Sequence, residues 1–147
     1  MTTTSPLEVL EPFQCWDLLR THRVGRIAFT DRALPAIRPL NYTVVGNRLM
    51  LRLAADDLGR RLDGQVVAFE VDDVDVAGHI GWSVVVLGTV ELVRSPNALV
   101  RAASLPPSWA GEGHQSAACL TVGELSGRRL HTTWATHPGS HEESVAG

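Results

Sequence analysis

The sequence contains no lysine: all 13 basic residues are arginine. This absence excludes a Walker-type P-loop, whose lysine contacts the nucleotide phosphates. It also excludes a lysine Schiff base with pyridoxal phosphate. An anionic ligand must therefore be held by arginine, by backbone amides or by helix N-termini.

Cysteine, net charge and long apolar runs are also scarce. Cys15 and Cys119 lie far apart and form no CxxC pair, so we interpret them as two reduced thiols. No apolar run approaches the roughly 20 residues that span a bilayer, and no secretory signal is visible. A formal charge of −3 without a basic run gives no reason to expect nucleic acid. We expect a cytoplasmic protein without membrane or nucleic-acid partners.

Signatures of three site types are missing or incomplete. Residues 81–85, GWSVV, lack the second glycine of a nucleophile elbow, and no G-x-G-x-x-G dinucleotide motif occurs. His131, His137 and His141 lack the spacing of a metal site, so we predict no metal and keep haem ligation as a minor alternative.

The length of 147 residues, with 44% hydrophobic and 20% charged residues, is typical of one globular domain. We predict a flexible arm over residues 1–10, one domain over 11–134 and a disordered tail over 135–147. No internal repeat is visible.

Short β-rich segments dominate that domain, so we predict a mainly β fold, a barrel with capping helices. Residues 72–81 are expected to form a polar connection. Strands are predicted at 24–30, 36–45, 48–53, 65–71, 82–93 and 117–122, a further strand at 128–134, and helices at 12–21, 55–62 and 95–104.

Residues 34–54 are the stretch around which the chain is organised, two strands joined at Gly46-Asn47. Arg38, Asn41 and Arg52 are polar where a core strand is apolar, which predicts that the hairpin lines a site. Asn41 and nearby backbone amides are suited to hydrogen-bond the edge of a planar heterocycle. Pro39 cannot donate to a ladder, which predicts an edge or a bulge there.

Arginines accompany this hairpin, and together they suit a phosphate because a guanidinium offers a planar fork of donors. Taken singly, each is better interpreted as a surface ion pair with a nearby aspartate. Trp82 has two interpretations, a cover for a ligand ring or a core or interface anchor. The arginines are Arg38, Arg52, Arg60 and Arg61, and the aspartates are Asp56, Asp57 and Asp63.

The order of segments over residues 8–131 resembles the pyridoxamine 5′-phosphate oxidase-like flavin proteins, above all their short actinobacterial branch. The matching segments are VGRIAF, LPAIRPLNY, RLAADD, VAFEVDD and GWSVVVLGTVE, of which IRPLNY and GWSVVVLG are the most specific. The resemblance implies a six-stranded antiparallel split barrel of the FMN-binding type. It also implies a homodimer with FMN in clefts at the subunit interface.

The resemblance implies a set of cofactor contacts and no catalytic residue. Strand 38–42 would run along the ring and ribityl chain, residues 52–54 would continue that wall, and 60–61 would reach the phosphate. Residues 82–83 would border the cofactor on the interface strand, and Gly127 and Arg128 would close the site from the partner. The predicted cofactor-binding set is Arg38, Pro39, Leu40, Asn41, Tyr42, Arg52, Leu53, Ala54, Arg60, Arg61, Trp82, Ser83 and Arg128.

Two departures from the family pattern narrow the expected function. Leu53, Leu58 and Gly59 stand in the region where relatives carry a phosphate-binding hydroxyl and a lysine. The pyridoxal phosphate-binding pattern is absent near 126–131, so vitamin B6 oxidation is not expected. The resemblance implies a flavin-dependent oxidoreductase of unknown substrate. Alternatives are a non-catalytic flavin or haem carrier or sensor, and an F420-dependent reductase.

Overall fold

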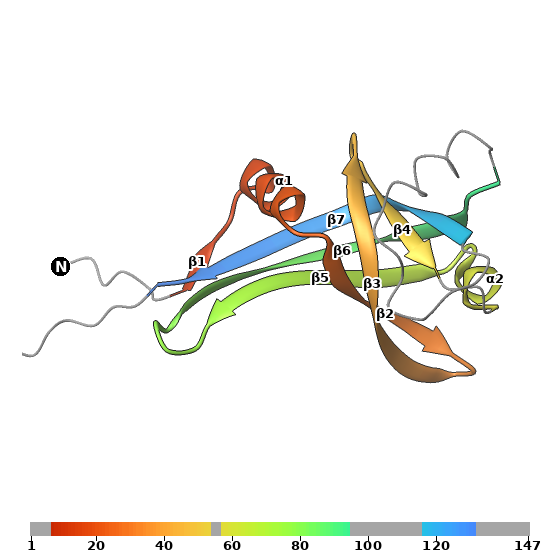
Figure 1. The fold of residues 1–147 in the computed structure, drawn as a ribbon, viewed down its shortest axis with the longest axis horizontal. Helices are drawn as coiled ribbons and strands as arrows, with labels where there is room; N and C mark the ends of the chain where they lie inside the picture. Colours follow the sequence, from red (N-terminus) through yellow and green to blue (C-terminus); the bar gives the residue numbers. More distant parts are fainter. Residues whose placement is uncertain (1–6, 54–56, 95–115, 132–147) are drawn as a thin grey trace, which may run out of the picture.

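The computed structural model describes residues 7–53, 57–94 and 116–131, which form one antiparallel sheet and two helices. In Figure 1, β5, β6 and β7 run side by side as long strands, and β2, β3 and β4 cross them toward one end. Neither described helix is long and apolar enough to cross a membrane. The elements are β1 (Leu7–Val9), α1 (Pro12–Thr21), β2 (Val24–Asp31), β3 (Leu34–Val45), β4 (Arg48–Leu53), α2 (Leu58–Leu62), β5 (Val66–Asp75), β6 (Ile80–Leu92) and β7 (Ser116–Leu130).

Six of the strands close into a barrel. The sheet order is β1-β7-β4-β3-β2-β5-β6, and β7 also pairs with β6, which joins the two sides. β7 is long enough to pair with β4 through residues 116–121 and with β1 through residues 128–130. The predicted six-stranded barrel is therefore confirmed, and β1 is a seventh strand added outside the closed circle.

Three predicted boundaries are wrong. Residues 7–9, expected in a flexible arm, form β1 because their backbone pairs with residues 128–130. The connection predicted over 72–81 is mostly strand, since β5 and β6 pair from Val66–Thr89 to Asp75–Ile80. The two strands predicted at 117–122 and 128–134 are one strand as far as Leu130. The helix predicted at 95–104 and the tail predicted at 135–147 lie outside the described residues.

Two other predictions from the sequence are confirmed. Pro39 pairs with Arg26 of β2, whereas within the described residues β4 pairs only with residues 41–45 of β3. In this part of the chain Pro39 therefore lies on an edge, where its missing N–H costs no ladder hydrogen bond. Cys15 and Cys119 are both free thiols.

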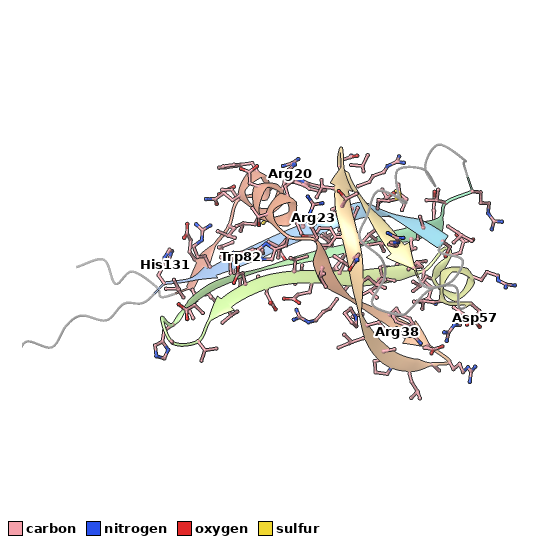
Figure 2. All side chains as sticks on the ribbon, in the orientation of Figure 1. Arg20, Arg23, Arg38, Asp57, Trp82 and His131 are labelled. Carbon is pink, nitrogen blue, oxygen red and sulfur yellow. The ribbon has the colours of Figure 1, made fainter. Side chains whose placement is uncertain are left out.

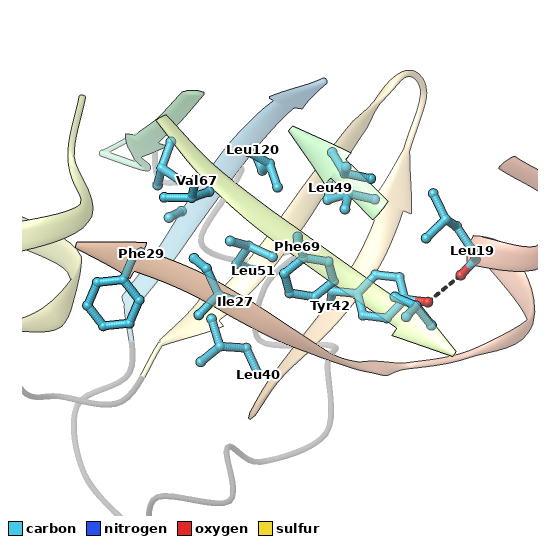
Figure 3. Packing of buried hydrophobic residues seen from close by; sticks show 14 of the residues in the cluster. Leu19, Ile27, Phe29, Leu40, Tyr42, Leu49, Leu51, Val67, Phe69 and Leu120 are labelled. Atoms are coloured by element: carbon cyan, nitrogen blue, oxygen red, sulfur yellow. Dashed lines mark hydrogen bonds between the residues drawn. The ribbon is translucent and has the colours of Figure 1, made fainter. Parts of the chain in front are cut away.

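The barrel interior is filled by aliphatic and aromatic side chains (Figure 3). Tyr42 is fully buried beside α1: its ring meets the Phe69 ring edge-on, with 5.2 Å between the ring centroids, and its hydroxyl donates a hydrogen bond to the Leu19 carbonyl at 2.6 Å. That bond ties the end of α1 to the core, and burial raises the pKa of Tyr42, so the hydroxyl remains a donor. The core also includes Ile27, Phe29, Leu40, Leu49, Leu51, Val67 and Leu120.

We predict that Gly88→Ala destabilises the barrel by about 1–3 kcal/mol, because the strands must shift to admit the new methyl group. Gly88 lies at a bulge between β6 and β7, and a Cβ there would fall 2.0 Å from the carbonyl oxygen of Thr121. Gly123→Ala is the matched control, since its Cβ would lie 3.3 Å from the Leu87 carbonyl oxygen. Urea unfolding would contradict the prediction if both variants lost equal stability.

Candidate functional site

Alternation along β3 divides the predicted site residues between two faces of the sheet. Leu40 and Tyr42 point into the barrel and are buried, and Arg38 shares their face. Leu53 of β4 is buried in the same core. Any contact that Leu40, Tyr42 or Leu53 makes with a ligand is therefore limited to its backbone.

The outward face of β3 carries a buried polar side chain, Asn41, which is only 3% exposed. Asn41 stands opposite Arg52 of β4, and Arg52 in turn stands opposite Ala117 of β7. Ala117 and Met50 form a small buried apolar cluster on this face. The row therefore combines an amide and a guanidinium with an apolar floor, which suits a planar polar ligand.

Arg60 and Arg61 of α2 have different surroundings. Arg61 Nη1 lies 2.6 Å from Asp31 Oδ1, and its Nη2 lies 3.5 Å from Asp57 Oδ1. The pair with Asp31 ties α2 to the end of β2, and the pair with Asp57 matches the ion-pair alternative considered for single arginines. Arg60 is exposed and forms no ion pair within the described residues. Figure 2 shows Asp57 and Arg38 at this end of the molecule.

The structure adds one hydroxyl that the sequence did not point to. Ser116 stands opposite Leu53, and a Cβ built on Gly59 would lie 3.4 Å from Ser116 Oγ. A hydroxyl is thus present beside α2, in the region where the local sequence shows none. No local sequence signal identifies Ser116, because only the pairing of β4 with β7 brings it there.

A second group of predicted residues lies farther along β6 and β7. Ser83 stands opposite Arg128, and Trp82 stands opposite Arg129. Trp82 points to the inner side, packs against the core and contacts the His22 ring edge-on at 4.9 Å. The interpretation of Trp82 as a core anchor is therefore supported, whereas Ser83 and Arg128 share the outward face.

One chain does not bring the two groups together. Asn41 is level with Val24 of β2, and Ser83 is level with Asp72 of β5. Because β2 and β5 are neighbours, three strand spacings, or about 14 Å, separate Asn41 from Ser83. Ala54, the remaining predicted contact, lies outside the described residues.

An ionisable cluster occupies the outward face between these groups. Arg26 Nη1 lies 3.1 Å from Glu70 Oε2 and 3.3 Å from Asp72 Oδ2. Burial raises the pKa of Glu70 to about 7, and its hydrogen bond to Asp72 adds to the shift. That hydrogen bond and the nearby Arg26 lower the pKa of Asp72. The two carboxyl groups thus share one proton near neutral pH, a property that sequence spacing alone does not reveal.

Comparison with known proteins agrees with this architecture. The pyridoxamine 5′-phosphate oxidase family profile matches residues 11–129. The chain belongs to this family. The resemblance inferred from the sequence is thereby confirmed.

Individual proteins resemble this chain in sequence or in structure. The uncharacterized protein Rv0080 of Mycobacterium tuberculosis is 34% identical over 118 residues, 72% of this chain and 74% of the relative. The FAD binding protein from Mycobacterium smegmatis is 31% identical with a TM-score of 0.69, over 84% of this chain and 98% of its own. A conserved protein of unknown function from Corynebacterium diphtheriae is 27% identical with a TM-score of 0.72, over 86% and 99%.

We predict that Glu70→Gln removes a fall in stability between about pH 4.5 and pH 7. With a pKa near 7 in the folded chain against 4.5 as reference, Glu70 holds a proton there that the unfolded chain has lost. The free energy of unfolding therefore decreases as pH rises through this window. Asp72 has a lowered pKa, so its contribution to the pH dependence of stability has the opposite sign and is confined to pH values below its reference pKa of 3.8. Urea unfolding across the window measures both slopes, and identical slopes would contradict the prediction.

Proposed function

We propose that the protein is a homodimeric flavin-binding split-barrel protein that acts as a flavin-dependent oxidoreductase. The observation that carries the proposal is the row of Asn41 and Arg52 on an apolar outer face. It occurs in a fold shared, at 31% identity, with a protein described as FAD-binding. FMN is the expected cofactor, and FAD is the alternative that this relative favours.

The residues around this row fit a flavin nucleotide. Arg52 and the exposed Arg60 would hold the phosphate. Asn41 would hydrogen-bond the polar edge of the ring. A bound flavin supplies hydride transfer, so the chain needs only to bind it, orient it and exclude water.

A second copy of the chain is part of this proposal. Ser83 and Arg128 are too far from Asn41 to contact the same ring within one subunit, so the partner subunit would supply them. Elsewhere on the outer face, apolar side chains are exposed that a partner would bury, including Ile37 (70% exposed) and Val66 (73% exposed). Cofactor sites would then lie at the dimer interface.

The sequence argues against one substrate, pyridoxamine phosphate. The pyridoxal phosphate-binding pattern is absent near residues 126–131. We therefore propose an oxidoreductase other than a true pyridoxamine phosphate oxidase. A carrier or sensor without turnover would also bind flavin, and turnover with a chemical or nicotinamide reductant separates the two.

We predict that Arg60→Ala weakens flavin binding by about 1–3 kcal/mol, the loss expected for a charge-assisted hydrogen bond to phosphate. Titration of the purified protein with FMN and with FAD, followed by flavin absorbance, measures the change. Arg20→Ala is the matched control, because it removes the same charge from α1, where Arg20 is paired with Asp17. Unchanged affinity in Arg60→Ala would remove Arg60 from the phosphate site. A haem Soret band, or a preference for F420, would overturn the flavin assignment.

We also predict that two weakly binding variants restore binding when they are mixed. A heterodimer contains one Arg60→Ala chain and one Arg128→Ala chain. One of its two interface sites combines the native Arg60 of the second chain with the native Arg128 of the first. Random reassembly therefore restores about a quarter of all sites in an isologous dimer. Flavin stoichiometry after co-refolding measures this fraction. No restoration would show that one chain carries the whole site, and a monomer in gel filtration would contradict the shared interface.

A further inference from the structure

A cavity of about 370 Å³ lies at the end of the β5–β6–β7 ribbon. Its lining includes Asp73, Asp75, Ile80, Trp82 and Arg129. Figure 2 shows Trp82 and His131 near this end, away from Arg38 and Asp57. The volume is in the lower part of the range of about 300–1,000 Å³ for small-molecule sites.

Three different side chains form a straight row across this cavity. Trp82 of β6 pairs with Asp73 of β5 on one side and with Arg129 of β7 on the other. Side chains at paired positions point to the same face of a sheet. The row therefore places a carboxylate, an indole and a guanidinium in sequence, and its two ends are about 10 Å apart.

Neighbouring contacts hold this row in place. The His22 ring lies 4.9 Å from the Trp82 ring at 84°, and its Nε2 lies 3.2 Å from Asp73 Oδ2. The other ring nitrogen of His22 lies 2.7 Å from Thr21 Oγ1. The Gly78 backbone N–H donates to Asp75 Oδ1 at 3.1 Å. A site fixed in this way loses little conformational entropy when a ligand binds.

The carboxylates retain the capacity to bind a cation. A carboxylate offers about four acceptor positions, so Asp73 and Asp75 have acceptor positions beyond those used by His22 and Gly78. Arg129 presents donors at the opposite end of the row. Between the charged ends, Trp82 and Ile80 provide an aromatic and an aliphatic surface.

We propose that this cavity binds a small planar zwitterion. The aromatic ring of the ligand packs on Trp82, its cationic group faces Asp73 and Asp75, and its anionic group binds Arg129. The inference does not rest on the proposed flavin function, since Trp82 points to the inner side while Ser83 and Arg128 face outward. It assigns Trp82 to this ligand instead of to the flavin.

The probe for this proposal is 4-(aminomethyl)benzoate, which carries an ammonium and a carboxylate at opposite ends of one ring. Isothermal titration calorimetry is expected to give a Kd below about 1 mM. Benzylamine and 4-methylbenzoate each lack one charge, and we expect both to bind about tenfold more weakly. The saturated 4-(aminomethyl)cyclohexanecarboxylate keeps both charges and loses the aromatic face, so it also binds more weakly. Equal affinity for the probe and benzylamine, or no binding of the probe, would overturn the proposal.

Variants test the three positions of the row separately. Arg129→Gln is expected to remove the preference for the probe over benzylamine, and Asp73→Asn the preference over 4-methylbenzoate. Arg48→Gln removes an exposed arginine of β4 and is the control, with unchanged affinity for the probe. The third variant, Trp82→Leu, changes a side chain that packs against the core. Arg129→Gln keeps the core intact, so it tests the proposal even if Trp82→Leu fails to fold. Native discrimination in Arg129→Gln would overturn the anionic half of the assignment.

Competition with flavin tests whether the cavity is a separate site. Saturating FMN is expected to leave the affinity for the probe unchanged within about twofold. Displacement of the probe by FMN would overturn the separation and return Trp82 to the flavin site. Failure of FMN to bind at all would contradict the proposed function and leave the measured affinity for the probe as evidence for the cavity.

Discussion

The pairing of β6 with β7 closes the barrel, and the other elements depend on it for their positions. It joins residues 81–92 to residues 118–130 and interlocks the two ends of an otherwise open sheet. α1 packs on the same ribbon, where Leu10 N–H donates to the Gly127 carbonyl oxygen at 2.9 Å. A Cβ at Gly127 would lie 2.6 Å from Cys15 Sγ, so only glycine admits the helix this closely. Closure of the barrel and placement of α1 are thus one packing arrangement.

Local sequence signals predicted the elements whose causes are local. The helix over residues 12–21 and the strand over 48–53 have the predicted bounds, and the edge position of Pro39 followed from its missing N–H. β1 was missed because a strand of three residues is too short to show an alternation of apolar and polar side chains. It is recognised only by its pairing with β7. The length of β5 and β6 was missed because Asp72, Asp73 and Asp75 read as a polar loop, whereas paired strands tolerate them at the exposed end of a ribbon.

The structure shows how the predicted site residues are arranged, which sequence order alone does not. Arg60 and Arg61 are adjacent and identical in type, yet Asp31 and Asp57 pair with Arg61, whereas Arg60 is exposed. Trp82 and Ser83 are likewise adjacent and face opposite sides, as the two-residue period of a strand requires. Residues that are adjacent in the sequence of a strand point to opposite faces of the sheet, because the strand is pleated. The outer face therefore carries Asn41, Arg52, Ser83 and Arg128, while the cavity lies on the inner side of the ribbon.

Strand β7 has neighbours on both sides at its two ends but, within the described residues, not at its centre. Residues 116–121 are bordered by β4 and residues 128–130 by β1, whereas residues 122–126 have only β6 as a strand neighbour. A backbone with one strand neighbour opens more easily than one with two. Amide hydrogen exchange along β7 would therefore be slow at both ends and faster in the middle. Opening of this central part leaves the pairs that β7 forms at its two ends in place.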